Sequence, residues 1–175
     1  MTAAEYSGSR SVPASAPGEE TVPSSAQTSV SEVLGSLRGL ISAYVEKVEE
    51  LERNRKPFEG IFGLKGGPKD DPCHDRFAED VQALVDSFAQ SAPSSHDAYA
   101  VLYELFSAAP THRNTNSAYW MLLAVQGTSF PLIDHLDPSD AAELRDFFVR
   151  TYPRRELLPA QIQILKKLRG RAASV

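Results

Sequence analysis

Cys73 and His74 are the residues whose types and positions come nearest to catalytic chemistry. They follow Asp71 and Pro72, a pair typical of a helix start because aspartate caps free amides and proline fits the first turn. The helix dipole favours a thiolate in that turn, and a cysteine with a histidine can act as a nucleophile. Two features oppose this chemistry. Adjacent helical side chains point about 100° apart, and the aspartates between residues 70 and 75 raise the pKa of the thiol.

The residues that could bind a metal do not form a metal-binding motif. The candidate ligands are Cys73, His74, Asp75, His96, His112 and His135. No two of them have the i,i+3 or i,i+4 spacing of helical motifs such as HExxH. A single cysteine also excludes a CxxC site and an internal disulfide framework. We therefore expect no metal and no cofactor.

A loop rich in glycine and proline is expected at residues 57–71. Its glycines and lysines are Gly60, Gly63, Gly66, Gly67, Lys65 and Lys69. A phosphate-binding Walker loop needs GxxxxGK followed by Ser or Thr and preceded by a strand, and this segment has neither. Apolar residues in such a loop either attach it to the core or contact a partner. We name Phe58, Ile61, Phe62 and Leu64 as candidate binding residues.

Charge is distributed unevenly along the chain. The 18 basic and 23 acidic residues give a net charge of −5, which argues against general nucleic-acid binding. Residues 150–175, however, contain seven basic residues and a single acid. The candidate binding residues there are Arg154, Arg155, Lys166 and Lys167. They can contact nucleic acid, anionic lipid or an acidic partner, or they can complement a helix dipole and the acidic remainder of the chain.

A dense polar run, Thr111 to Asn116, precedes Trp120. Such a run can line a ligand pocket at a helix N-terminus, but it is also typical of a cap and turn. In the second interpretation, Trp120 at helical spacing is a core residue. The segment from His112 to Asn116 belongs with Cys73 and His74 in an alternative hypothesis, a small thiol- or metal-dependent enzyme or ligand sensor.

The hydrophobic pattern predicts an all-α protein, a compact bundle of five to six helices. Residues 1–28 are rich in Ser, Ala and Pro and contain no Leu, Ile, Phe or Trp, so we expect a disordered tail. The helical domain is expected at 29–171. It comprises a long amphipathic helix at 29–56, the loop at 57–71 and the remaining helices at 72–171.

The first helix carries a heptad stripe. Its members are Val30, Leu34, Leu37, Ile41, Tyr44, Val48 and Leu51, spaced alternately by four and three residues. The stripe can pack inside the chain's own bundle or against a second chain. The repeat is shorter than most free-standing coiled coils, which favours the bundle.

The later elements are predicted from caps and prolines. We expect a helix from Pro72 to about Gln90, and one from about His96 to Ala108 that Pro110 ends. A fourth helix is expected to begin at Thr115 or Asn116, followed by a turn at 131–136 and a helix opened by Asp137 and Pro138. The last helix is predicted to bury Leu158, Ile162, Leu165 and Leu168 on one stripe.

No apolar stretch approaches the length of a membrane-spanning helix, and no secretory signal is visible, so a cytoplasmic protein is expected. The favoured hypothesis is a non-enzymatic protein–protein interaction or assembly module, with a protein partner or self-association. It would use the first helix and the Phe58–Leu64 loop. Besides the enzyme or sensor, the second alternative is a nucleic-acid-associated regulator that uses the basic C-terminal helix.

Overall fold

The computed structural model describes residues 29–55, 70–154 and 157–174, and these residues confirm the all-α prediction. Six α-helices of nine residues or more are present, and no strand occurs in the described ranges. They are α1 (Val30–Arg53), α2 (Cys73–Gln90), α3 (Ser95–Thr111), α4 (Asn116–Ala124), α6 (Pro138–Thr151) and α7 (Pro159–Ala172). Between α4 and α6 lie a 3₁₀ turn, η2 (Val125–Ser129), and the four-residue α5 (Phe130–Ile133).

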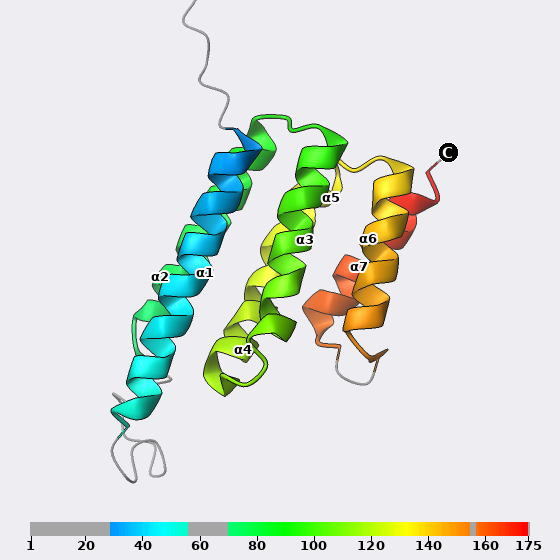
Figure 1. Ribbon diagram of the computed structural model, residues 1–175. Coiled ribbons are helices and arrows are strands. Elements are labelled where there is room, and N and C mark those ends of the chain that lie inside the picture. Colours follow the sequence, from blue (N-terminus) through cyan, green and yellow to red (C-terminus); the bar gives the residue numbers. More distant parts are fainter. Residues whose placement is uncertain (1–28, 56–69, 155–156, 175) are drawn as a thin grey trace, which may run out of the picture.

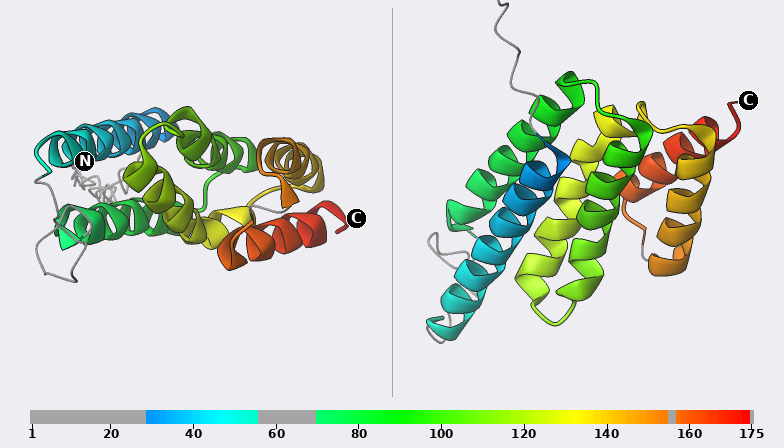
Figure 2. Two further views of the ribbon diagram at one scale, coloured as in Figure 1. Left: turned by 90° about the horizontal axis from the view of Figure 1, so that it is seen from below. Right: turned by 45° about the horizontal axis from the view of Figure 1, so that its top comes forward.

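The helices form two layers (Figures 1 and 2). One layer contains α1, α3 and α6. The other contains α2, the segment from η2 to α5, and α7, and α4 leads from α3 into this second layer. Every helix of nine residues or more therefore has an inner face that packs against neighbours and an outer face that is open.

Polar side chains accept hydrogen bonds from backbone amides at the starts of three helices. Ser29 accepts a hydrogen bond from the Glu32 amide, and its own amide donates to the Glu32 carboxylate, which completes a capping box at α1. Asp71 accepts from the Cys73 amide at 2.9 Å at the start of α2. Asp137 accepts from the Asp140 amide, also at 2.9 Å, at the start of α6.

The heptad stripe of α1 packs inside the chain. Leu37, Ile41, Tyr44 and Val48 are buried, and the flanking members Val30, Leu34 and Leu51 are partly buried. The helix contacts both α2 and α3. Of the two arrangements that the sequence allowed, the bundle is the one that forms, so these side chains are not available as a seam for a second chain.

The prediction that Pro110 ends α3 was wrong. Pro110 lies inside the helix, which continues to Thr111. Proline has no amide hydrogen to donate to the carbonyl four residues earlier, which is that of Phe106. The hydroxyl of Tyr152 donates to this carbonyl at 2.5 Å, so the proline leaves no orphaned acceptor. A tertiary contact thus makes the proline tolerable.

Several predicted positions of apolar residues were also wrong. Trp120 is 51% exposed on α4, and Ile162 is 50% exposed on α7, so neither is a core residue. Leu158, which was predicted to be buried on the same stripe as Ile162, is only partly buried. The predicted turn at 131–136 begins instead with α5, which has Pro131 in its first turn, where a missing amide is harmless.

Candidate interaction surface

Cys73 lies in a groove of about 410 Å³ between α1 and α2. Burial, together with the hydrogen bond to Asp71 and that residue's negative charge, raises the pKa of its thiol to about 11. The effect of the aspartate agrees with the expectation from sequence. A thiol with this pKa is protonated near neutral pH, and the thiolate is the nucleophilic form. The described surroundings of Cys73 therefore do not activate it.

His74 is held by a different partner. It is buried, and its Nδ1 shares a hydrogen bond of 2.8 Å with the Tyr44 hydroxyl on α1. The Tyr44 ring in turn stacks on Phe77 with their centroids 4.1 Å apart. This arrangement joins α1 to α2. Cys73 lines the open groove, whereas His74 belongs to the joint, so the structure does not combine the two candidate catalytic residues into a nucleophile and its base.

The candidate metal ligands are not brought together. In the part of the chain that the structure describes, no group of three His, Cys, Asp or Glu side chains could hold a metal ion.

The polar run before Trp120 forms a connection between helices. The amide of His112 donates to the carbonyls of Ala108 and Ala109, which closes α3. The hydroxyl of Thr115 lies 3.4 Å from the Glu49 carboxylate of α1. Ser117 donates to the Glu52 carboxylate at 2.6 Å. The run is thus a cap and turn that is tied to the end of α1.

Four of the eight predicted binding residues, Phe58, Ile61, Phe62 and Leu64, lie outside the described residues, as does Arg155. Their expected role stays a prediction. The glycines and lysines of the same loop, from Gly60 to Lys69, are likewise outside the described ranges.

The remaining predicted binding residues, Arg154, Lys166 and Lys167, fall into two groups. Lys167 donates at 2.7 Å both to the Phe130 carbonyl and to the Asp134 carboxylate. Arg171, one turn later, donates to the Leu136 carbonyl. These two cations satisfy acceptors around α5, as the dipole interpretation expects. Lys166 and Arg154 are exposed and border a different surface, although Lys166 also lines the groove beside α5.

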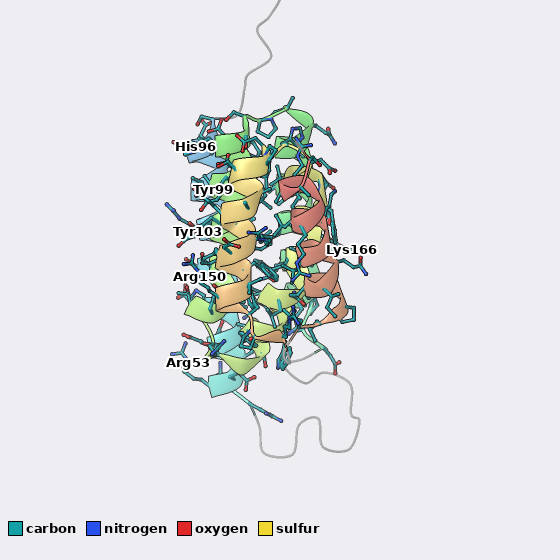
Figure 3. The ribbon with its side chains drawn as sticks, turned by 90° about the vertical axis from the view of Figure 1, so that its right-hand side faces the viewer. Arg53, His96, Tyr99, Tyr103, Arg150 and Lys166 are labelled. Carbon is teal, nitrogen blue, oxygen red and sulfur yellow. The ribbon has the colours of Figure 1, made fainter. Side chains whose placement is uncertain are left out.

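That surface is a groove of about 460 Å³ on the outer side of α7, which we call the α7 groove. Its lining residues are Arg154, Leu157, Ile162, Leu165, Lys166 and Arg169. The apolar side chains form its floor, and the three cations are exposed around it. Figure 3 shows Lys166 on α7, on the opposite side of the view from Tyr99, Tyr103 and Arg150.

The groove exists because α7 is rotated away from its predicted orientation. Gln161, not Ile162, faces the core, where its amide donates to the Leu123 carbonyl at 2.8 Å and to Gln126 at 3.1 Å. Ile162 is the next residue, about 100° around the helix, so it points outward. Sequence reasoning found two of the three cations of this site, Arg154 and Lys166, but missed Arg169 and the apolar floor. A signal was available: Gln161 lies three and four residues before Ile164 and Leu165, so the three share the face that is buried.

Comparisons with known proteins assign no family: no family model, no curated protein and no solved structure matches the chain. Among the described helices, none combines the length and apolarity needed to cross a membrane. The cytoplasmic location expected from the sequence stays a prediction.

Proposed function

We propose that this protein is a protein–protein interaction module and that the α7 groove is its contact surface. The observation that carries the proposal is Ile162, which is 50% exposed on an apolar floor formed with Leu157 and Leu165. A single exposed apolar residue is ordinary, but one that lines a groove with other apolar residues is typical of a contact site. Covering the exposed half of this side chain contributes roughly 1 kcal/mol to binding.

The other grooves support this function less well. The α1–α2 groove combines Lys47 and Arg76 with Asp71 and Asp80. It therefore has no net charge that would attract a partner of opposite charge. The α5–α7 groove contains Asp134 and three cations, of which Lys167 and Arg171 already bind acceptors of the chain itself. The α7 groove combines an apolar floor with three cations and has no acidic residue among its described lining residues.

The proposed class of function, a protein–protein interaction module, is the one that the sequence indicated. The contact surface is the α7 groove instead of the first helix. The stripe of α1 is buried, and the Phe58–Leu64 loop is outside the described residues. The loop remains a second candidate contact.

The test is selection of binding peptides from an unbiased random display library with the full-length protein. We expect wild type to recover peptides that Ile162→Glu binds at least about tenfold more weakly, because a carboxylate in the floor must be desolvated. The matched control is Val149→Glu, which changes a residue of similar exposure, 47%, on α6 and outside the groove lining. Its affinity should stay within about twofold of wild type.

Two results would overturn the proposal. Wild type could recover no peptide, or the recovered peptides could bind Ile162→Glu as well as they bind wild type. Urea denaturation of both variants checks that folding is intact, and analytical ultracentrifugation shows whether a second copy of the chain occupies the groove.

A further inference from the structure

The cations of α7 divide into two sets with different surroundings. Lys167 and Arg171 lie on the side toward α5 and bind the Asp134 carboxylate and backbone carbonyls. Arg169 lies on the side of the α7 groove, and Lys166 lies between the two sides and lines both grooves. Among the described residues, neither Lys166 nor Arg169 forms an ion pair, and the same holds for Arg154 at the other end of the groove.

The exposed set follows the helix axis. Lys166 comes four residues after Ile162, and Arg169 comes three residues later, so the three share one face of α7. From Ile162 to Arg169 the helix rises by about 10 Å, or two turns. The groove thus presents an apolar position followed by two positive positions in a line, with Arg154 as a further cation beside the floor.

We infer that the occupant of the α7 groove is an acidic amphipathic helix of a partner protein. This inference rests on the proposed function and adds the chemistry of the partner. An α-helix lying along α7 has the same rise, so carboxylates about one turn apart on it match the spacing of Lys166 and Arg169. Leucine-like anchors at i, i+3, i+4 and i+7 give such a helix one apolar face for the floor.

Charge complementarity distinguishes this occupant from others. A basic or neutral helix would leave Lys166 and Arg169 without counter-charges, and like charges facing each other oppose binding. Nucleic acid would satisfy the cations but would place its charged phosphates over Ile162 and Leu165. The described lining offers no aromatic side chain on which a base could stack.

The experiment uses the same random peptide library with two full-length proteins, wild type and the double variant Lys166→Glu/Arg169→Glu. We expect wild type to enrich peptides with Asp or Glu flanking helically spaced apolar residues. The double variant should instead enrich peptides with Lys or Arg at those flanks and bind the wild-type peptides at least about tenfold more weakly. Raising the salt concentration from about 0.05 to about 0.5 M should weaken the wild-type complexes, since both partners are charged at exposed positions.

A matched control separates this pair of cations from the neighbouring pair. Lys167→Ala should leave the peptide preference unchanged, because Lys167 faces Asp134. If peptides bind through Ile162 but show no acidic enrichment and no charge reversal, the inference fails while the proposed function stands. If binding does not depend on Ile162 at all, both fail. Binding of single-stranded DNA that needs Lys166 but tolerates Ile162→Glu would overturn both in favour of a polyanion site.

Discussion

The first and last helices show two ways in which an amphipathic helix is oriented in a bundle. α1 turns six apolar side chains inward, all 6% exposed or less: Val33, Leu37, Ile41, Tyr44, Val45 and Val48. α7 also has apolar residues at helical spacing, but it buries Gln161 and leaves Ile162 half exposed. Both helices end a layer of the bundle (Figures 1 and 2), so their positions alone do not explain the difference.

The two helices differ in the interactions that fix how each is rotated about its own axis. α1 is oriented by its six buried apolar side chains, together with the hydrogen bond between Tyr44 and His74. In α7 a buried polar network contributes: Gln161 donates to Gln126, Gln126 donates to the Tyr152 hydroxyl at 2.7 Å, and Tyr152 donates to the Phe106 carbonyl. Buried polar groups are costly when unpaired, so a connected network favours one orientation over others. That orientation places an apolar side chain on the surface.

The largest expected effect compares the two helices directly. Leu37→Ala in α1 should lower the free energy of unfolding by about 2–5 kcal/mol, because Leu37 is fully buried. Ile162→Ala in α7 should change it by less than about 1 kcal/mol, because half of the side chain is already in water. Urea denaturation measures both. Equal losses would mean that Ile162 belongs to the core.

The polar network can be broken at Tyr152. Tyr152→Phe should lower the free energy of unfolding by about 1–3 kcal/mol, because it leaves the buried Phe106 carbonyl and the Gln126 amide without their partner. The control is Tyr103→Phe, at a tyrosine that is 43% exposed, with an expected change within about 0.5 kcal/mol. If Tyr152→Phe proves as mild as Tyr103→Phe under urea denaturation, the network does not orient α7.

Cys73, which lines the groove between α1 and α2, should react slowly with thiol reagents. With a pKa of about 11, Cys73 is almost entirely protonated at pH 8, and its iodoacetamide alkylation should be at least about tenfold slower than in the urea-unfolded chain. Because the native pKa is raised, the rate should keep rising as pH increases toward 11. A native rate that levels off below pH 9 would contradict the assignment and return Cys73 to the catalytic candidates.

The smallest expected effect compares neighbouring lysines of α7. Lys167→Ala should destabilise the fold by about 0.5–1 kcal/mol, since its bonds to the Phe130 carbonyl and Asp134 are only partly exposed. Lys166→Ala should leave stability unchanged within error. Thermal unfolding of the two variants measures the contrast. A loss at Lys166 as large as that at Lys167 would show that Lys166 is occupied within the chain.

Local signals in the sequence predicted much of this molecule. The capping residue Asp137 begins a helix where expected, since capping depends on residues only a few positions apart. α2 begins one residue later than predicted, at Cys73, with Pro72 in the capping position. The heptad stripe identified the buried face of α1. The cations at 154 and 166 were named as binding residues before their groove was known.

The errors share one physical cause. Pro110, Trp120 and Ile162 were assigned by rules that consider one element at a time, but each position depends on a distant residue or on the rotation of a helix. Pro110 is accommodated by Tyr152, 42 positions away along the chain, and Ile162 is displaced outward by the pairing of Gln161 with Gln126.

The sequence by itself therefore determined the all-α class, most helix starts, the inward stripe of α1 and the presence of unbalanced cations near the C-terminus. Only the tertiary structure decided which cations are satisfied internally and which remain around an open apolar floor. The reason is that helix formation and capping are local, whereas the rotation of a helix depends on which buried groups find partners in other helices.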